Sequence, residues 1–229
     1  MKQVIQSRRT GKLALKDVPA PGVRGGHLLV RTKASLISAG TERMVVDFAK
    51  KNLAAKAQAR PDLVKKVLEK AKKEGLWNTW KAVMARLDEP LPLGYSAAGE
   101  VVAIGAGLEG EFRVGDRVAM AGAGIANHAE LNAVPRNLVA RIPDTVTDDE
   151  ACYGTVGAIA LHAVRNMQVG LGDVVAVIGC GLVGQMAMRF LALAGARVVA
   201  LDYAEDRLQL ARDLGAELAI KPDADAARA

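Results

Sequence analysis

The feature that most constrains this chain is a glycine-rich turn between a buried strand and a helix. The segment AVIGCGLVGQ, residues 176–185, carries Gly179, Gly181 and Gly184 in the spacing G-x-G-x-x-G. The apolar run DVVAVI precedes the turn, and GLVGQMAMRFLALAGA follows it with the length and composition of a helix. A strand, this turn and a helix together predict the phosphate-binding end of an α/β fold with a parallel sheet.

Each of the three glycines meets a different geometric need in such a turn. Gly179 permits the tight turn, Gly181 lets the backbone approach a diphosphate, and Gly184 allows the helix to pack closely on the strand. The helix N-terminus, at Leu182 and Val183, offers unpaired N–H groups and a positive dipole end to the phosphates. Glycine-rich turns also occur for purely structural reasons, and that alternative remains open.

An acidic residue at the end of the next strand strengthens the prediction of dinucleotide binding. RVVALD ends in Asp202, 18 residues after Gly184, where a carboxylate accepts hydrogen bonds from the adenosine ribose hydroxyls. Because a carboxylate there repels a 2′-phosphate, we expect NAD(H) to be preferred over NADP(H). Tyr203 brings no compensating charge. Arg207 is predicted either to lie beside the adenosine or to be an ordinary exposed helix residue.

The chain from residue 148 onward is predicted to hold only half of such a cofactor domain. DEACYGTVGAIALHAVRNM indicates a helix, and AELAI indicates a third strand after the helix AEDRLQLARDLGA. A complete domain of this type has about six strands in the order 3-2-1-4-5-6. Only the first three are present, and the terminal DADAARA (223–229) resembles a cut end. We therefore expect this chain to bind adenine dinucleotide weakly and to turn over no substrate.

The first part of the chain has the texture of a small β-barrel or sandwich. HLLVRTKASLI (27–37), SAAGEVVAIGAG (96–107), GDRVAMAGAG (115–124) and HAELNAVP (128–135) are short β-type runs separated by glycine turns. The predicted fold class is therefore α/β plus β. The predicted domains are residues 1–147 and 148–229.

A basic helical segment, about residues 43–88, interrupts the β-type runs. Val64, Val67, Leu68 and Ala71 fall at helical spacing, Pro61 suits a first helical turn and Gly75 can end the helix. Between Arg43 and Arg86 the sequence has twelve Lys and Arg against four Asp and Glu. These lysines are interpreted as a solvated face or as a docking surface for an acidic partner or anionic substrate. Nucleic acid is the least favoured partner because no interleaved aromatics accompany the charge.

Composition places the chain among soluble cytoplasmic proteins. Hydrophobic residues make up 51% and charged residues 24%, and no apolar run reaches the length of a membrane span. Cys152 and Cys180 stand in no paired or metal-like spacing, as in a reducing compartment. We expect a small-molecule substrate and no membrane partner. The sequence does not decide between a monomer, a homo-oligomer and fusion to a C-terminal domain.

These features together resemble the medium-chain dehydrogenase/reductase superfamily, the alcohol-dehydrogenase-like enzymes with a GroES-like domain and a Rossmann domain. The motifs that carry the resemblance are LPLGYSAAGEVVAIGAG (91–107), VGDRVA (114–119), LVARIPD (138–144) and RLQLARDLGA (207–216). The resemblance implies a GroES-like β-barrel, here with a helical insertion, followed by a partial Rossmann domain. It also implies an NAD-dependent oxidoreductase.

The sequence departs from the zinc-dependent members of that superfamily at every ligand position. Their Cys-Gly-Thr-Asp reads Ala39-Gly40-Thr41-Glu42 here, and their Gly-His-Glu reads Gly94-Tyr95-Ser96. Their third ligand falls at Gly154, with Cys152 two places away, and the four-cysteine lobe of the structural zinc is missing. His27, His128 and His162 are scattered and are interpreted as surface or packing residues. Because catalytic zinc needs about three converging ligands, no zinc is expected.

The resemblance to zinc-free members implies hydroxyl groups as proton donors. Tyr95, at the position of the zinc-binding histidine, is the first candidate and Thr41 the second; Tyr95 filling the volume of the metal is an equal alternative. The helical insertion between SLISAGTERMVV and PLPLGYSAAGEVV is similar to that of bacterial two-part oxidoreductases, which implies a sugar-like, cyclitol or carbonyl substrate. A zinc-free quinone or enone reductase and a catalytically silent binding module remain alternatives.

Overall fold

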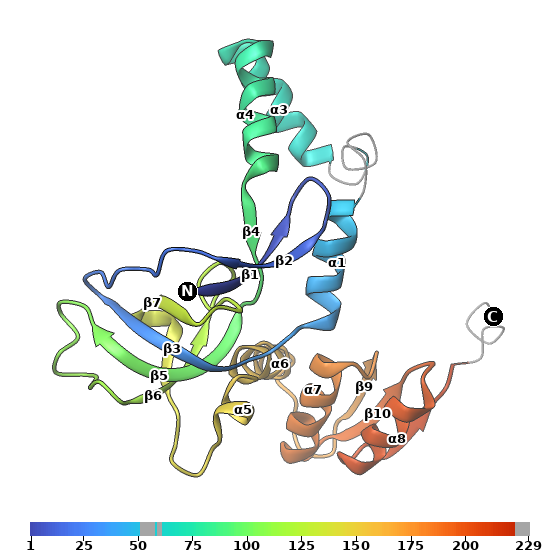
Figure 1. Ribbon diagram of the computed structural model, residues 1–229. Coiled ribbons are helices and arrows are strands. Elements are labelled where there is room, and N and C mark those ends of the chain that lie inside the picture. The colour runs from blue at the N-terminus through green and yellow to red at the C-terminus, as the bar shows by residue number, and fades with distance from the viewer. Residues whose placement is uncertain (51–57, 59–60, 223–229) are drawn as a thin grey trace. The chain divides into compact units, whose positions relative to one another are not determined.

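The computed structural model describes residues 1–50, 58 and 61–222 of the chain (Figure 1). Part of the predicted helical segment (51–57, 59–60) and the terminal DADAARA (223–229) lie outside the described residues. The chain divides into two compact units, Met1–Tyr153 and Gly154–Ala229. The mixed α/β fold expected from the sequence is confirmed, and each unit is described by itself.

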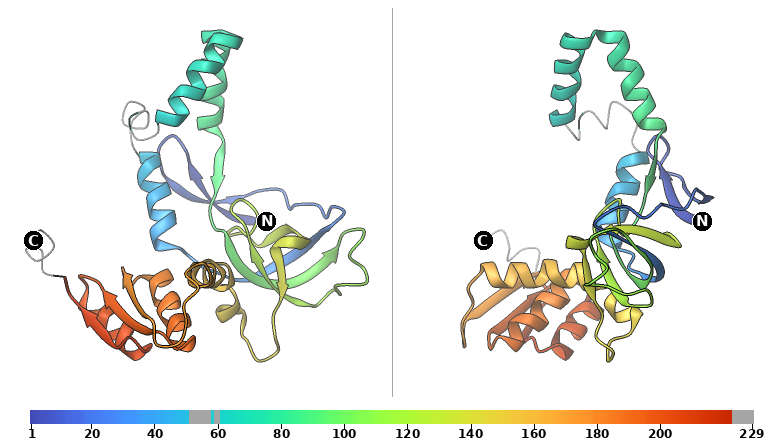
Figure 2. Two further views of the ribbon diagram at one scale, coloured as in Figure 1. Left: turned by 180° about the vertical axis from the view of Figure 1, so that it is seen from behind. Right: turned by 90° about the vertical axis from the view of Figure 1, so that its left-hand side faces the viewer.

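A curled, antiparallel five-stranded sheet forms the body of the first unit (Figure 2). Alternate residues of its strands face one core, which includes Leu28, Val30, Val101, Val118 and Met120, as the period of two in a half-buried strand requires. The strand order is β7-β3-β5-β6-β8. The strands are β3 (His27–Ser35), β5 (Ser96–Ile104), β6 (Arg117–Ala121), β7 (Leu131–Pro135) and β8 (Val139–Arg141), with a 3-10 turn at Arg136–Leu138 before β8.

A smaller antiparallel sheet joins the chain's start to the segment that follows the helices. Its order is β2-β1-β4, with β1 at Lys2–Ser7, β2 at Leu13–Asp17 and β4 at Pro90–Pro92. The two prolines of β4 fit its position, because an edge strand bonds on one side only and tolerates a missing N–H.

Three helices cover most of the described residues of the predicted helical segment and extend it at its start. They are α1 (Ala39–Lys50), α3 (Pro61–Glu74) and α4 (Leu76–Asp88). Pro61 is the first residue of α3, and Gly75 separates α3 from α4 with a φ of 84°, a left-handed conformation that favours glycine. The helical region begins at Ala39 instead of residue 43, so the Ala39–Glu42 motif forms the first turn of α1.

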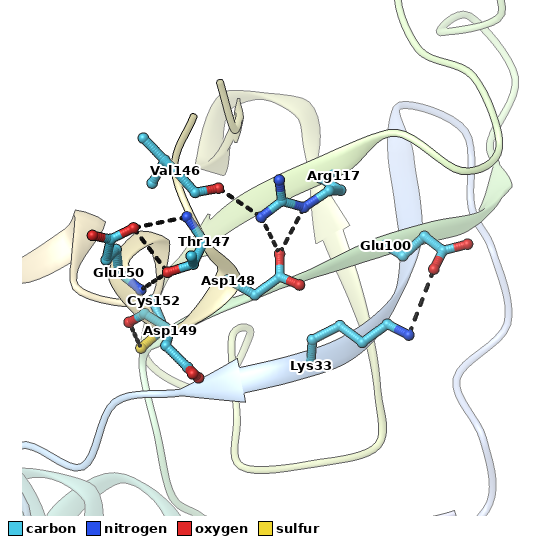
Figure 3. Close-up of polar contacts among 9 residues, drawn as sticks. All are labelled: Lys33, Glu100, Arg117, Val146, Thr147, Asp148, Asp149, Glu150 and Cys152. Carbon is cyan, nitrogen blue, oxygen red and sulfur yellow. Dashed lines mark hydrogen bonds and ion pairs between the residues drawn. The ribbon is translucent and has the colours of Figure 1, made fainter. Parts of the chain in front are cut away.

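The helix predicted over residues 149–167 is broken in two. Thr147 caps α5 (Asp148–Ala151) through a capping box with Glu150, and α6 (Gly154–Asn166) begins anew after Cys152 and Tyr153. The side chain of Arg117, on β6, donates to Asp148 Oδ1 at 3.0 and 3.1 Å and to the carbonyl of Val146 at 2.7 Å (Figure 3). These bonds fasten α5 to the five-stranded sheet, and the break falls where the two units meet in sequence.

The second unit is a parallel three-stranded sheet with helices packed on one face. The order β11-β10-β9, with both pairs parallel, is the first half of a doubly wound sheet. Its core joins Val198 and Ala200 of β10 to Met188, Leu191 and Leu208 of the helices. The elements are β9 (Val174–Ile178), α7 (Leu182–Leu193), β10 (Arg197–Leu201), α8 (Glu205–Asp213) and β11 (Leu218–Ile220).

Candidate functional site

The glycine-rich turn connects β9 to α7, as expected, and its three glycines have distinct environments. Gly179 has a φ of 92°. A Cβ on Gly181 would meet no atom within 4 Å, so that position opens to free space. A Cβ on Gly184 would lie 2.1 Å from the carbonyl oxygen of Gly179, so any other residue would clash with the backbone there. The turn therefore has a left-handed corner that glycine adopts readily, an open middle and a helix packed closely against its start.

The N-terminus of α7 is the part of this turn whose geometry suits an anion. Gly181 is the N-cap, with φ −75° and ψ −173°, and it has no side chain to cap the first helical N–H groups. Leu182 and Val183, which follow it, are partly exposed. First-turn N–H groups without an intrahelical partner, at the positive end of a helix dipole, suit a phosphate.

Asp202 is held against this turn by backbone hydrogen bonds. Its Oδ2 accepts from the N–H of Cys180 at 2.8 Å and its Oδ1 from the N–H of Ala204 at 2.9 Å. The N–H donors of Ala204 and Cys180 hold the pKa of the Asp202 carboxyl below its usual range. A carboxylate has about four acceptor sites, so these two bonds leave capacity for further donors. Asp202 is therefore a fixed, ionised acceptor beside the turn.

Arg207, on α8, is the charge nearest to Asp202 in this part of the site. Its Nη1 lies 3.7 Å from Asp202 Oδ2, and its side chain is 55% exposed. The sequence left open whether Arg207 lies near the expected adenosine position or points away. It lies beside the carboxylate expected to bind the ribose.

Gln185 is a site residue that sequence reasoning missed. Its buried Nε2 donates to the carbonyl of Cys180 and to the carbonyl of Arg207, both at 3.0 Å, so it ties the turn to α8. The sequence did contain a signal for it, because Gln185 is an amide residue on the otherwise apolar buried face of α7. Cys180 is also buried, and burial, followed by the charge of Asp202, raises the pKa of its thiol. Cys180 thus remains a neutral thiol.

The two hydroxyl candidates, Thr41 and Tyr95, lie in the first unit. Thr41 is exposed in the first turn of α1, and Tyr95 is half-buried immediately before β5, with its carbonyl accepting from the N–H of Gly122 at 2.9 Å. Their neighbours Glu42 and Gly94 both contact His128. Glu42 does so through its carboxylate, and a Cβ on Gly94 would lie 2.6 Å from the His128 backbone nitrogen. The segments that carry Thr41 and Tyr95 therefore converge on His128.

His128 is the centre of a little-exposed polar cluster, Ser35–His128–Glu42, that the sequence did not reveal. Its Nδ1 lies 2.9 Å from Ser35 Oγ, and its Nε2 lies 3.2 Å from both carboxylate oxygens of Glu42. The side chains of His128 and Glu42 are only 10% and 13% exposed. His128 anchors α1 to the loop before β7, a structural role that agrees with its interpretation as a surface or packing residue.

The positions equivalent to zinc ligands supply no converging donor set. Ala39 and Gly154 have no ligand atom in their side chains, and the thiol of Cys152 donates to the carbonyl of Asp149 at 3.1 Å. Burial and the charge of Asp149 raise the pKa of that thiol. Across the described ranges, no three His, Cys, Asp or Glu side chains gather as a metal site would require.

Comparison with known proteins finds dehydrogenases among the relatives of this chain. The chain is 31% identical over 152 residues to (R,R)-butanediol dehydrogenase of Bacillus subtilis, covering 56% of this chain and 43% of that protein. It is 30% identical over 171 residues to L-threonine 3-dehydrogenase of Francisella philomiragia, covering 63% of this chain and 48% of that protein. The chain thus spans less than half the length of these curated relatives. No protein-family model matches it.

Solved structures show the same fold over nearly the whole chain. A mycobacterial protein complexed with NADPH aligns with a TM-score of 0.73 at 24% identity, covering 100% of this chain and 61% of that one. Butanediol dehydrogenase of Bacillus subtilis aligns with a TM-score of 0.69 at 20% identity, covering 99% and 65%. Galactitol-1-phosphate dehydrogenase of Escherichia coli gives 0.71 at 18% identity, covering 95% and 60%.

The resemblance to the medium-chain dehydrogenase/reductase superfamily is thereby confirmed, because the relatives and structural neighbours of this chain are medium-chain dehydrogenases/reductases. The GroES-like and partial Rossmann arrangement is the fold that these neighbours share with it.

Proposed function

We propose that this chain is the N-terminal portion of a zinc-free, NAD-linked oxidoreductase that transfers hydride to or from a sugar-like or carbonyl substrate. The observation that carries the proposal is the glycine-rich turn with Asp202 hydrogen-bonded to it. A fixed carboxylate beside an uncapped helix N-terminus provides one acceptor set for ribose hydroxyls and one donor set for a diphosphate.

The residues of the second unit fit an adenine dinucleotide. The open space at Gly181 leaves room for a diphosphate, and the backbone of Leu182, Val183 and Gly184 would hold it at the start of α7. Asp202 would accept from the ribose hydroxyls, and Arg207 would border the adenosine. The dinucleotide, when bound, supplies the hydride-transferring nicotinamide; the protein's share is to bind and orient it.

Preference for NAD(H) over NADP(H) follows from the charge of Asp202. Backbone donors lower its pKa, so it is ionised at neutral pH and repels a 2′-phosphate. Arg207 acts in the opposite sense, because a guanidinium near this position accommodates that phosphate. Since Asp202 is fixed by two backbone bonds and Arg207 is mostly exposed, we assign the larger effect to Asp202.

In the first unit, Tyr95 and Thr41 are proposed as proton donors to the substrate. The absence of usual zinc ligands at Ala39, Tyr95 and Gly154 supports hydroxyl chemistry at this position. Tyr95→Phe in the complete protein tests the role: turnover should fall with little change in cofactor affinity. Unchanged turnover would leave Tyr95 as a filler of volume.

A nuclear magnetic resonance titration of this chain tests dinucleotide binding even when binding is weak. Addition of NADH or ADP-ribose should shift the backbone amide signals of Gly181, Leu182 and Val183, and NADPH should do so at concentrations at least about tenfold higher. Gly181→Asp should abolish the shifts, because its side chain fills the open space at that position with a like charge. No hydride transfer is expected from this chain alone.

The control variant for that titration is Gly110→Asp. Gly110 also has open space around its Cβ position and no left-handed φ, but it lies in the first unit. It should bind NADH as the unsubstituted chain does. If Gly181→Asp and the unsubstituted chain show equal amide shifts on addition of NADH, the glycine turn has only a structural role. The result would then favour a catalytically silent binding module. Assays of the complete protein with quinones, enones and sugar-like substrates distinguish a quinone or enone reductase from an oxidoreductase of sugar-like substrates.

A further inference from the structure

The helices α3 and α4 form a hairpin (Figure 1), and large apolar residues at its turn, the tip of the hairpin, are exposed. Leu76, Trp77 and Trp80 are 79%, 77% and 53% exposed. Single exposed apolar residues are ordinary, but large ones grouped within five positions mark a surface that is covered by something else. These are also the only two tryptophans of the chain.

Lysines surround this tip on both helices. Lys72 and Lys73 lie in the last turn of α3, Lys81 lies one residue after Trp80 on α4, and all three are exposed. At about 1.5 Å per residue, they lie about 3 to 9 Å along the helices from Gly75, within two helical turns. The sequence from Lys70 to Lys81 contains four lysines and one acidic residue, Glu74. The tip is therefore apolar at its end and cationic behind it.

The charge decides among the partners that such a tip can take. A second copy of the hairpin would bring two cationic ends together and is disfavoured by their repulsion. An acidic protein would form ion pairs with the lysines. It would also need an apolar cavity that accommodates the exposed side chains of Leu76 and Trp77. A bilayer with anionic headgroups satisfies both features without a preformed cavity, because its apolar layer lies below its charged layer.

We propose that the hairpin tip, Lys72 to Lys81, docks on the surface of an anionic lipid bilayer. Leu76 and Trp77 enter the boundary between headgroups and acyl chains, Trp80 lies at headgroup level, and Lys72, Lys73 and Lys81 contact lipid phosphates. Tryptophan is enriched at such interfaces because its ring is apolar and its N–H is polar. Penetration of about 5–10 Å is typical of peripheral segments of this kind.

Such docking requires no membrane-spanning segment. None of the helices in the described part of the chain has both the length and the apolar character needed to cross a bilayer. The expectation of no membrane partner rests on the lack of an apolar run long enough to span a bilayer. Contact of a hairpin tip with the bilayer surface is a different mode of binding. It is independent of the dinucleotide site, which lies in the other unit.

Tryptophan fluorescence measures this contact directly, because both tryptophans are in the tip. The chain is mixed with vesicles of equal parts phosphatidylcholine and phosphatidylserine, and emission and co-sedimentation are followed. We expect a blue shift and binding that weakens as salt rises. Vesicles of phosphatidylcholine alone should give neither. Lys72→Glu with Lys73→Glu should weaken binding at least about tenfold, since each cationic side chain near the surface adds to affinity.

The matched control places the same charge change elsewhere. Lys12→Glu with Lys16→Glu alters two exposed lysines outside the hairpin and should bind as the unsubstituted chain does. Circular dichroism before lipid addition shows whether each variant keeps its helices. Trp77→Ala should reduce binding to anionic vesicles, while Trp80 still reports the remaining contact.

Three results would overturn the proposal. The first is an absence of binding to the anionic vesicles. The second is an equal loss of binding in the double variant of the tip (Lys72 and Lys73) and in the control (Lys12 and Lys16). That result would show that binding depends on the net charge of the chain and not on the hairpin tip. The third is a blue shift with polyglutamate but none with vesicles, which would assign the tip to an acidic polypeptide.

Discussion

The carboxylate of Asp202 accepts a hydrogen bond from the backbone N–H of Cys180 at 2.8 Å, which joins the end of β10 to the turn after β9. The two residues are 22 positions apart, and Cys180 stands between the first two glycines of the turn. The bond thus fixes the acidic acceptor relative to the N-terminus of α7, which is proposed to bind the diphosphate. Preorganisation of this kind lowers the entropy cost of binding.

Replacement of Asp202 by Ala should weaken or abolish the preference for NADH. The change removes the charge that repels a 2′-phosphate and leaves Arg207 to attract it. We expect the ratio of NADPH to NADH affinity to rise at least about tenfold, measured by amide-shift titration. Arg207→Ala is the opposing variant and should lower NADPH affinity without changing that for NADH. An unchanged ratio in both variants would remove these residues from the adenosine ribose site.

The lowered pKa of Asp202 also predicts how stability depends on pH. The folded-state pKa lies below the unfolded value of about 3.9, so the ionised carboxylate stabilises the fold above that value. This contribution is lost as pH falls through the folded pKa. Asp202→Asn should therefore be less stable than the unsubstituted chain at neutral pH, with the difference shrinking in acid. Urea unfolding of both chains at neutral pH and at acidic pH measures it.

The close contact of Gly184 with Gly179 predicts a contrast between two alanine substitutions. Gly184→Ala places a Cβ 2.1 Å from a carbonyl oxygen, so α7 must move away from β9, at a cost of about 1–3 kcal/mol or more. Gly181→Ala meets open space and should unfold at nearly the same urea concentration as the unsubstituted chain. Equal stability of the two variants would contradict the turn geometry described above.

The Ser35–His128–Glu42 cluster predicts a strong dependence of the first unit on Glu42. Glu42→Ala leaves His128 with one partner fewer in a site of low exposure, and we expect a loss of about 1–3 kcal/mol. Asp47→Ala is the control on the same helix, since its pairs with Arg43 and Lys50 are exposed and 3.7 Å long. Exposed pairs of this kind contribute little. Similar losses in both variants would show that Glu42 is an ordinary surface residue.

Local signals explain which parts of this structure the sequence predicts. The glycine spacing, Pro61 at a helix start and Gly75 at a helix end all act through the conformation of one or two residues, and each was placed correctly. The broken helix at Cys152 was missed because periodicity alone does not show where a chain passes between two units. Ser96 Oγ donates to the carbonyl of Cys152 at 2.6 Å, a bond between residues 56 positions apart.

The Glu42–His128 pair was missed because it joins two residues that are far apart in the sequence. The two residues are 86 positions apart, and neither belongs to a periodic pattern or a spaced motif. Their meeting depends on the turn between Leu93 and Tyr95 and on the loop before β7, which come together only in the folded sheet. Gln185 differs, since its place on an apolar helix was visible in the sequence. The tertiary contacts of a site depend on the topology of the fold, whereas the positions of its glycines depend on local backbone geometry and can be predicted from the sequence.

The uncovered face of the second sheet gives the last prediction. Val174 and Ile178 of β9 and Leu218 and Ile220 of β11 point away from the buried core, and they are 62%, 86%, 54% and 44% exposed. β9 is also an edge strand, so its outer N–H and C=O groups lack a strand partner within the described sheet. An apolar sheet face beside an open edge promotes association. We expect this chain to bind a hydrophobic dye and to self-associate as its concentration rises.

Val174→Lys with Leu218→Lys should suppress both effects, because it places charge on that face while removing little buried area. Val198→Lys is the contrasting variant: Val198 is fully buried on the neighbouring strand, so the charge should unfold the second unit and raise dye binding. Sedimentation velocity and dye fluorescence separate the two cases. A chain that stays monomeric and binds no dye at high concentration would show that this face is covered, in which case the strand order alone does not define the exposed surface of the half-domain.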